Sequence, residues 1–380
     1  MRKYISPKQT LHSPQAPQNL SSRRNFIKLA SLGFAFASAG SQAMLLSSSP
    51  RKVGVALVGL GGYSRGWLAP ALQQTQHCEL RGIVTGTPSK IPLWQSKYDI
   101  PDKNVYNYEN MHEIANNPDI DVVYVVVPTA LHLKYAQIGA NAGKHVWCEK
   151  PMAMTVEQCQ RMIDVCNKNK VKLTVGYRMQ HEPNTLAFRQ YALQQKFGNI
   201  TSVFSRAGYG GNGLPADNWR MQKAMGGGAM YDMGVYPVNG VRFLTNTEPI
   251  AITAQHDKSH PHIFKEVDET TNFTLEFANG STADCATSVV KSYNNIRVDA
   301  DEGWYKLAPM SPYNGVKGNT SEGLKLPAIT GMQQSLQMDN DALAILGKGP
   351  ILVPGEEGMR DIHIVESAFK SASLGKRVAL

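Results

Sequence analysis

Cysteines are scarce in this sequence, and no group of residues has the spacing of a metal site. Its five cysteines are odd in number, and Cys159 and Cys166 are too far apart on one expected helix to form a disulfide. The sequence also contains no G-x-S-x-G motif and no P-loop. We therefore expect no metal site, no clear disulfide framework, and no chemistry of the serine-hydrolase or P-loop type.

Acidic residues are absent from the first 43 residues, which carry Arg2, Lys3, Lys8, Arg23, Arg24 and Lys28. The segment Ser22–Lys28 resembles the twin-arginine export motif. The apolar stretch Leu29–Ala39 is shorter than the roughly 20 residues that span a bilayer. We expect residues 1–43 to be a signal peptide, cleaved after Ala39 or Ala43. This predicts a periplasmic protein that is exported folded, with the twin-arginine export machinery as a partner.

The high net charge belongs mostly to this leader. The whole chain has 39 basic and 30 acidic residues, so without the leader 33 basic residues face 30 acidic ones, a net charge of +3. The charge therefore does not indicate nucleic-acid binding. The remaining length suits two domains, which we place at residues 51–177 and 178–380.

A glycine-rich turn follows the first apolar segment, residues 52–58. The turn reads Gly59-Leu60-Gly61-Gly62-Tyr63-Ser64, and a helical pattern and a second strand, residues 79–84, come after it. This order is the context of a dinucleotide-binding fingerprint. Gly59 permits the tight turn, Gly61 allows a pyrophosphate to approach the backbone, and Ser64 takes the third small position. Leu60, Gly62 and Tyr63 are expected to contact the cofactor as well.

No acidic residue follows the second strand, where an NAD site would bind the ribose hydroxyls. The segment is Thr85-Gly86-Thr87-Pro88-Ser89-Lys90. Thr85, Ser89 and Lys90 could hold a 2′-phosphate, which a carboxylate would repel. The sequence therefore favours tightly bound NADP over NAD.

Alternating strands and helices continue to residue 175. The run 121–127 is apolar throughout, as in a strand buried on both faces, and Pro128 ends it at a position expected to contact the cofactor. Thr155 is expected to cap a helix. Repeated β-α units predict a parallel, doubly wound Rossmann sheet.

Three further segments carry chemistry. Glu149-Lys150-Pro151 follows a strand end, where ligands bind in open α/β sheets. Residues 226–236 read GGGAMYDMGVY, and residues 354–359 read PGEEGM. Together with the glycine-rich turn, these segments resemble the glucose–fructose oxidoreductase and inositol dehydrogenase family. The resemblance covers nearly the whole chain after the leader.

The resemblance implies a C-terminal α/β domain with an open, mostly antiparallel sheet that makes subunit contacts, hence a homodimer or tetramer. The composition of four segments agrees with strands, and Asn279-Gly280 is typical of a hairpin turn. The family most often has His where this chain has Tyr236. That Tyr, with the exported and NADP-type features, resembles the glucose–fructose oxidoreductase branch. Glu149 and Lys150 match positions that contact the cofactor.

Asp232 and Tyr236 are four residues apart, so a helix would place both on one face. Tyrosine has an ordinary pKa near 10, and a nearby ammonium such as that of Lys150 would lower it. We expect Tyr236 to take a proton from a sugar hydroxyl while hydride leaves the same carbon. Asp232 would hold a substrate hydroxyl and tune Lys150.

Other residues are candidates for contacts with the ligands. Tyr177 and Arg178 follow the last strand of the first domain, in a turn that faces cofactor or substrate in the family. Arg178 is either a clamp for sugar hydroxyls or part of a structural ion pair. Trp219 and Arg220 are expected to line the sugar pocket.

These features favour an oxidoreductase that oxidises an aldose at C1 to the lactone and passes the hydride through bound NADP to fructose or another aldose. Three alternatives stay open: a dehydrogenase with exchangeable cofactor, an exported NAD-dependent glycosidase, and a sugar-binding protein without activity. The leader supports the first interpretation, because an exported enzyme must carry its cofactor and regenerate it in place. The sugars themselves are not identified.

Overall fold

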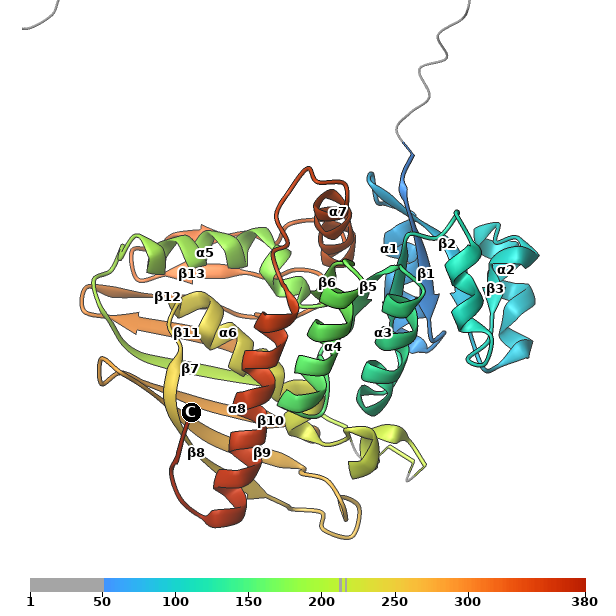
Figure 1. The fold of residues 1–380 in the computed structure, drawn as a ribbon. Coiled ribbons are helices and arrows are strands. Elements are labelled where there is room, and N and C mark those ends of the chain that lie inside the picture. The colour runs from blue at the N-terminus through green and yellow to red at the C-terminus, as the bar shows by residue number, and fades with distance from the viewer. Residues whose placement is uncertain (1–50, 212–213, 216) are drawn as a thin grey trace, which may run out of the picture. The chain divides into compact units, whose positions relative to one another are not determined.

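Two β-sheets organise the part of the chain that the structure, a computed structural model, describes: residues 51–211, 214–215 and 217–380 (Figure 1). Residues from 51 onward pack as one compact unit. The expected signal peptide, residues 1–43, lies outside the described residues.

The N-terminal sheet contains six strands in the described residues, all parallel, in the order β3-β2-β1-β4-β5-β6. Its strands are β1 (Val53–Val58), β2 (Cys78–Val84), β3 (Val105–Tyr106), β4 (Val122–Val125), β5 (His145–Cys148) and β6 (Leu173–Val175). The strand order reverses between β1 and β4, so the loops that follow these two strands diverge and leave a crevice. The parallel, doubly wound sheet is confirmed.

Helices cover both faces of the N-terminal sheet, which explains its uninterrupted apolar strands. Val55 and Leu57 of β1 pack toward one group of helices, while Ala56 and Val58 pack toward the other. The first group is η1 (Ser64–Leu68), α1 (Ala69–Leu72) and α7 (Gln333–Ile345); the second is α3 (His132–Asn141) and α4 (Val156–Lys168). The helix α2 (Ile91–Tyr98) follows β2. The Thr155 hydroxyl caps α4 by accepting from Gln158 N at 3.1 Å.

The C-terminal sheet contains nine strands in the described residues, in the order β14-β13-β12-β11-β7-β10-β9-β8-β15. All neighbouring pairs are antiparallel except β7 and β10. The strands are β7 (Ile200–Gly208), β8 (Pro249–Asp257), β9 (Thr270–Phe277), β10 (Thr282–Ser288), β11 (Tyr293–Ala300), β12 (Gly303–Leu307), β13 (Gly318–Thr320), β14 (Lys325–Leu326) and β15 (Val378–Ala379). The expected hairpin joins β9 to β10, with Gly280 at φ 84°. The open, mostly antiparallel sheet is confirmed.

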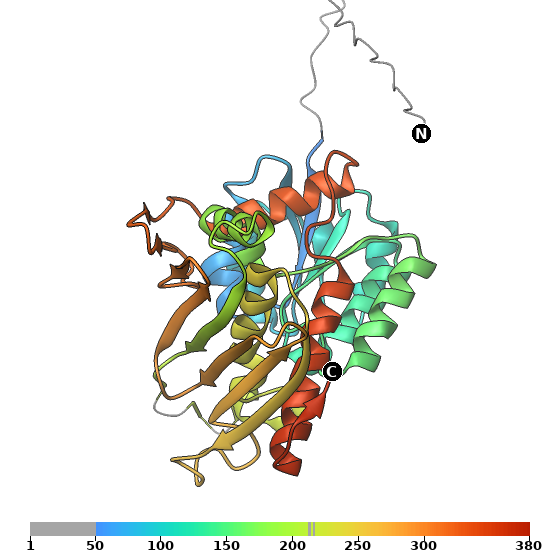
Figure 2. The same ribbon diagram turned by 90° about the vertical axis from the view of Figure 1, so that its left-hand side faces the viewer.

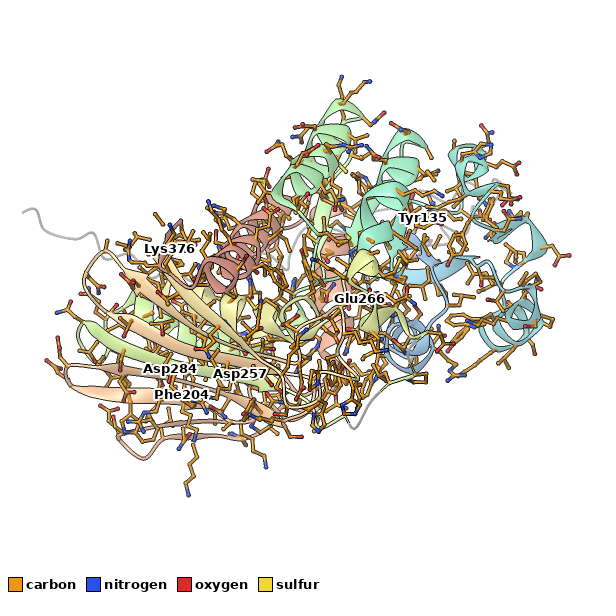
Figure 3. The ribbon with its side chains drawn as sticks, turned by 90° about the horizontal axis from the view of Figure 1, so that it is seen from below. Tyr135, Phe204, Asp257, Glu266, Asp284 and Lys376 are labelled. Atoms are coloured by element: carbon orange, nitrogen blue, oxygen red, sulfur yellow. The ribbon has the colours of Figure 1, made fainter. Side chains whose placement is uncertain are left out.

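One face of the C-terminal sheet is covered by α5 (Pro183–Leu193), α6 (Val235–Thr245) and α8 (Gly355–Leu374), and Figure 2 shows this layer edge-on. The short π-helical turn η9 (Met230–Gly234) leads into α6. Helix α8 also packs against α4 and β6, which joins the layers of the two sheets. Phe204 and Asp284 are paired neighbours on the opposite face of the sheet, seen from below in Figure 3.

The five cysteines are buried and free of disulfides. Cys159 and Cys166 both lie on the buried face of α4. Among residues 51–211, 214–215 and 217–380, no helix is long and apolar enough to cross a membrane.

Candidate active site

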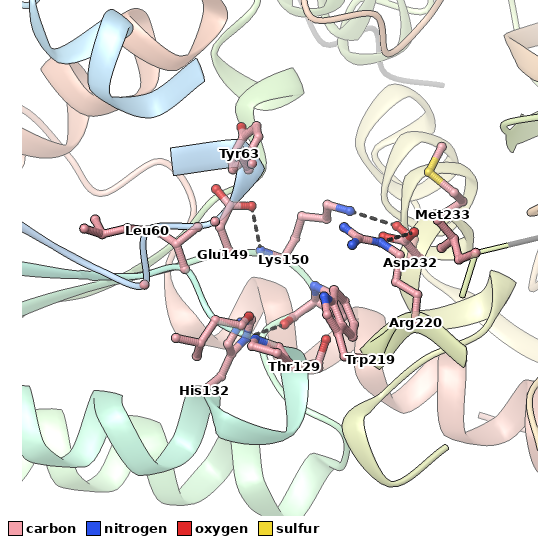
Figure 4. Close-up of a pocket in the computed structure, with 18 of the residues that line it drawn as sticks. Leu60, Tyr63, Thr129, His132, Glu149, Lys150, Trp219, Arg220, Asp232 and Met233 are labelled. Atoms are coloured by element: carbon pink, nitrogen blue, oxygen red, sulfur yellow. Dashed lines mark hydrogen bonds and ion pairs between the residues drawn. The ribbon is translucent and has the colours of Figure 1, made fainter. Parts of the chain in front are cut away.

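A cavity of about 1110 Å³ opens where the carboxyl ends of β1, β2, β4 and β5 meet the C-terminal sheet and the segment before α6. Most of the residues predicted from the sequence line it. Those residues are Gly59, Leu60, Gly61, Gly62, Tyr63, Thr85, Lys90, Pro128, Glu149, Lys150, Arg178, Trp219, Arg220, Asp232 and Tyr236. Figure 4 shows part of this lining.

The glycine-rich turn has the form that a dinucleotide site requires. Gly59 adopts φ 96°, and a Cβ there would lie 2.4 Å from the carbonyl oxygen of Val126. Ser64 donates to the Gly59 carbonyl at 2.6 Å and so fixes the turn. At Gly61 and Gly62, a Cβ would meet no described atom within 4 Å, because both glycines border the cavity. This leaves the backbone open to a phosphate group.

The end of the cavity beyond β2 is polar and lacks a carboxylate among the described residues. It is lined by Thr85, Gly86, Thr87, Lys90 and Tyr108. The Thr85 hydroxyl accepts from Thr87 N at 3.1 Å, and Lys90 Nζ donates to Leu60 O at 3.0 Å. The ammonium of Lys90 therefore bridges the two loops that would surround the adenosine half of a dinucleotide.

Lys150 reaches across the cavity from the end of β5 to the C-terminal domain. Its Nζ donates to the main-chain carbonyl of Asp232 at 2.8 Å and lies 4.5 Å from the centre of the Tyr236 ring. Asp232, which we expected to tune Lys150, thus contacts it through its main-chain carbonyl. The Asp232 carboxylate turns away because it accepts from Arg220 Nε at 3.0 Å and from the Tyr209 hydroxyl at 3.2 Å (Figure 4).

Two cations lie beside the Tyr236 side chain. Arg178 Nη2 lies 3.5 Å from the hydroxyl oxygen, and Lys150 faces the ring. Burial raises the pKa of Tyr236, but Lys150 and then Arg178 act against burial, and the pKa is lowered overall. The direction agrees with the expectation that an ammonium at Lys150 favours the phenolate.

The contacts of Arg178 match neither of its two expected roles by itself, a clamp for sugar hydroxyls or part of a structural ion pair. It is buried at the cavity wall and donates to Ser311 O at 2.8 Å, to Pro312 O at 3.0 Å and to the side-chain oxygen of Gln333. No carboxylate of the described residues is among these partners. Its position is thus set by neutral acceptors, and its charge acts on Tyr236.

Two residues predicted to contact the cofactor do not line the cavity. Ser89 is exposed beyond it. Tyr177 is buried in the core, where burial and then the nearby Asp361 raise the pKa of its hydroxyl. The next residue, Arg178, lies at the cavity wall instead, at the start of the 3₁₀ helix η6 (Arg178–His181).

Comparisons with known proteins identify the family. The model described as "Oxidoreductase family, NAD-binding Rossmann fold" matches residues 53–177, and the "GFO/IDH/MocA C-terminal domain" matches residues 185–306. The aldose-aldose oxidoreductase of Caulobacter crescentus, solved in complex with glycerol, is 34% identical. The match covers 87% of this chain and 100% of that one, with a TM-score of 0.82. The chain belongs to this oxidoreductase family.

Two further relatives show the range of the family. The D-xylose 1-dehydrogenase [NADP(+)] of Haloarcula marismortui is 27% identical, over 88% of this chain and 95% of its own. A scyllo-inositol dehydrogenase of Lactobacillus casei, solved with NAD(H) and scyllo-inositol, shares the fold at 19% identity and a TM-score of 0.72, over 87% of this chain and 99% of its own. The chain is therefore an oxidoreductase with a nicotinamide-dinucleotide-binding domain.

Several residues of this oxidoreductase site were not predicted. His132 is buried at the cavity wall, with its ring nitrogens 2.9 Å from Val127 O and 2.9 Å from Pro151 O, so it ties two cavity loops together. Tyr313 stacks on Trp67, with ring centres 4.2 Å apart, and covers the cavity from the C-terminal domain. His132 alone carried a signal, its place just after the strand end, whereas Tyr313 lies in a loop without a motif.

Proposed function

We propose that this chain is a periplasmic, NADP-dependent oxidoreductase that oxidises an aldose at C1 to the lactone. The hydride then passes to a second carbonyl substrate, fructose or another aldose. The observation that carries the proposal is the buried Tyr236 side chain, with Lys150 over its ring and Arg178 at its hydroxyl, at the wall of a cavity that also contains the glycine-rich turn. The likeness to an aldose-aldose oxidoreductase supports the substrate class.

The residues present fit NADP rather than NAD. The open faces of Gly61 and Gly62 leave space beside the backbone for a pyrophosphate, and Thr85, Thr87 and Lys90 line the far end. A 2′-phosphate there would meet a cation and hydroxyls, and no carboxylate of the described residues would repel it. When bound, NADP would supply the group that accepts the hydride from the aldose and gives it to the second carbonyl substrate.

Tyr236 would act as the general base. Its phenolate takes the proton of the C1 hydroxyl as that carbon loses hydride, and the same proton is returned to the second carbonyl when it is reduced. The aldose thereby loses two electrons and two hydrogens, and the second sugar gains them. Lys150 and Arg178 stabilise the phenolate before transfer.

Asp232, Arg220 and Trp219 would form the sugar subsite. The Asp232 carboxylate already accepts from Arg220 and Tyr209, so its remaining lone pairs can accept from a sugar hydroxyl. The Arg220 guanidinium lies over the Trp219 ring at 4.4 Å, which fixes a flat surface suited to a pyranose. The exposed face of the C-terminal sheet is the proposed site of subunit contacts in a dimer or tetramer.

The proposed periplasmic location implies that the cofactor is retained. The twin-arginine segment, Ser22–Lys28, indicates folding before export. An exported enzyme cannot exchange its dinucleotide with a cytoplasmic pool, so tight binding and a second carbonyl substrate follow. The similarity to D-xylose 1-dehydrogenase favours one alternative, a dehydrogenase that releases its reduced cofactor.

One experiment separates these functions. The purified protein is passed through gel filtration, its bound nucleotide is identified by mass, and aldoses are then tested by nicotinamide fluorescence. We expect retained NADP, its reduction by an aldose without added cofactor, and reoxidation by fructose or a second aldose. A cofactor-free protein that needs added dinucleotide would contradict the closed cycle. Cleavage of an aryl glycoside without lactone formation would identify a glycosidase instead.

A further inference from the structure

Helix α7 presents three glutamines to the back of the active site. Gln333, Gln334 and Gln337 are buried, with exposed fractions of 5%, 0% and 1%. A buried amide is costly unless its groups are hydrogen-bonded, so three of them on one helix require an explanation. Each one contacts a residue of the site or the support of such a residue.

The contacts of the first two glutamines are direct. Arg178 donates to the side-chain oxygen of Gln333, and Gln334 Nε2 donates to the Tyr63 hydroxyl at 3.3 Å. Both Arg178 and Tyr63 line the cavity. Helix α7 therefore contacts the catalytic side of the cavity and the glycine-rich turn.

Gln337 acts over a longer path. Its Nε2 donates to the Tyr124 hydroxyl oxygen at 3.0 Å, and that hydroxyl donates to Glu149 Oε1 at 2.7 Å. The other oxygen of Glu149 accepts from Lys150 N at 3.2 Å. Gly176 closes the space around this path, since a Cβ there would lie 2.7 Å from Glu149 Oε1. The path joins α7 to the residue next to Lys150.

The direction of the hydrogen bonds decides the state of Glu149. Because Gln337 donates to Tyr124, the hydrogen of Tyr124 is free to point at Glu149. Burial raises the pKa of Glu149 overall, and the hydrogen bond from Tyr124 is the largest influence that acts against burial. With the amide of Gln337 reversed, Tyr124 would donate to Gln337 and leave Glu149 without this bond.

Asp341 explains why the Gln337 amide has this orientation. Asp341 is one turn further along α7 and is buried. No hydrogen bond of ordinary length reaches its carboxyl oxygens or Gln337 Oε1 from the described residues, although the Thr174 and Gln337 side chains lie close enough to lower the pKa of Asp341. Burial raises the pKa of Asp341 to about 7. A proton on Asp341 would supply the missing donor to Gln337 Oε1 and leave Gln337 Nε2 for Tyr124.

We propose that Gln337 is a positioning residue of the active site, which orients the Tyr124 hydroxyl toward Glu149 and so favours the ionised form of Glu149 beside Lys150, with Asp341 fixing the orientation of the Gln337 amide. An ionised Glu149 offsets part of the effect of Lys150 and Arg178 on Tyr236. The kinetic part of this inference rests on the proposed function, whereas the hydrogen-bonded path does not.

Other titratable groups face Glu149 and helix α7. Glu149 faces Lys150 and Arg178, which lower its pKa after Tyr124. The pKa of Asp341 is affected by burial, then by the Thr174 and Gln337 side chains, and by no charged group. Three titratable residues contact α7 from outside: Cys78 at Met338 O, His181 at the Asn340 side chain and Lys172 at Ala344 O. Asp339, on α7 itself, accepts from main-chain N–H groups of the turn before β2.

The test measures the titration of Glu149 without turnover. The side-chain carboxyls of glutamate are labelled with carbon-13, and Glu149→Gln identifies the signal. Tyr124→Phe and Gln337→Met each remove one link at nearly constant volume. The midpoint of Glu149 should rise by about one to two pH units in Tyr124→Phe, the value of one hydrogen bond to a charged group. It should rise by less in Gln337→Met, because the Tyr124 hydroxyl keeps its hydrogen and loses only the donor that holds it toward Glu149. The double variant should shift no further than Tyr124→Phe alone.

Controls use the same helix. Leu336→Ala alters an exposed residue of α7, 41% exposed, and should leave the Glu149 midpoint unchanged. Asp341→Asn keeps a donor toward Gln337 and should also leave the Glu149 midpoint unchanged. Asp341→Leu removes that donor and should shift the Glu149 midpoint as Gln337→Met does. In turnover, the acid limb of the kcat/KM profile should move to lower pH as the Glu149 midpoint rises, because a neutral Glu149 no longer raises the pKa of Tyr236. The KM for the aldose should stay within about twofold.

Two results would overturn the inference: an unchanged Glu149 midpoint in folded Gln337→Met, or additive shifts in the double variant. If Gln337→Met does not fold, the Glu149 midpoint is compared between Tyr124→Phe and Asp341→Leu. An unchanged midpoint in folded Asp341→Leu would then overturn the inference. A wild-type protein without turnover on any sugar would contradict the proposed function, and the carboxyl titration would still decide the role of Gln337.

Discussion

Replacing Lys150 by methionine should raise the pKa of Tyr236 and slow the enzyme at neutral pH. The ammonium lies 4.5 Å from the centre of the Tyr236 ring. At an effective dielectric constant of about 20, a charge at this distance contributes about 3–4 kcal/mol, or about two to three pKa units. Without it, burial and Glu149 raise the pKa, and only Arg178 remains to lower it.

The expected consequence is a rate that depends on pH. Because the phenolate is the base, kcat/KM at pH 7 should fall by about 100-fold or more in Lys150→Met. It should recover roughly tenfold for each pH unit until Tyr236 ionises. The wild-type profile should level off at lower pH, because its Tyr236 has the lower pKa.

The assay is reduction of bound NADP by an aldose, followed by fluorescence between pH 6 and pH 10. Lys370→Met serves as the matched control, since Lys370 is exposed on α8 and does not line the cavity. Retention of NADP through gel filtration shows that the variant is folded. A pH profile in Lys150→Met identical to that of the wild type would refute the reasoning that Lys150 sets the pKa of Tyr236.

Three further predictions follow from the same structure. Tyr236→Phe should remove most turnover while bound NADP is retained, measured by its absorbance after gel filtration; wild-type rates would exclude Tyr236 as the base. Lys90→Gln should weaken NADP about tenfold and NAD much less, measured by fluorescence titration, and equal losses would place the 2′-phosphate elsewhere. Arg242→Met should lower the free energy of unfolding by about 3–5 kcal/mol in urea, because it leaves the buried Asp361 without its cation and Glu357 with Arg360 alone. A loss below 1 kcal/mol would contradict this.

The parts of the site that the sequence predicts are those set by local rules. A glycine-rich turn after a strand, and a lysine after another strand, must lie at one edge of a parallel sheet. Asp232 and Tyr236 share a helical face because they are four residues apart. The meeting of Lys150 and Tyr236 in one cavity does not follow from these rules and was expected from the family resemblance.

Long-range packing determines what the sequence does not predict. Gln333 contacts Arg178 across 155 residues of sequence, and Gln337 contacts Tyr124 across 213. No motif marks these glutamines, because an amide on a helix is ordinarily exposed. Tyr177 was misplaced for a related reason: the position of a turn does not determine which of two neighbouring side chains faces the cavity.

The contact between Lys150 and Asp232 shows how helix geometry determines chemistry. Asp232 lies in the π-helical turn η9, in which a carbonyl pairs with the N–H five residues further on. Pro237, five residues after Asp232, has no N–H and cannot donate to this carbonyl. Lys150 Nζ donates to it. The ammonium is thereby held over Tyr236 by the main chain, and the Asp232 carboxylate stays available to the sugar.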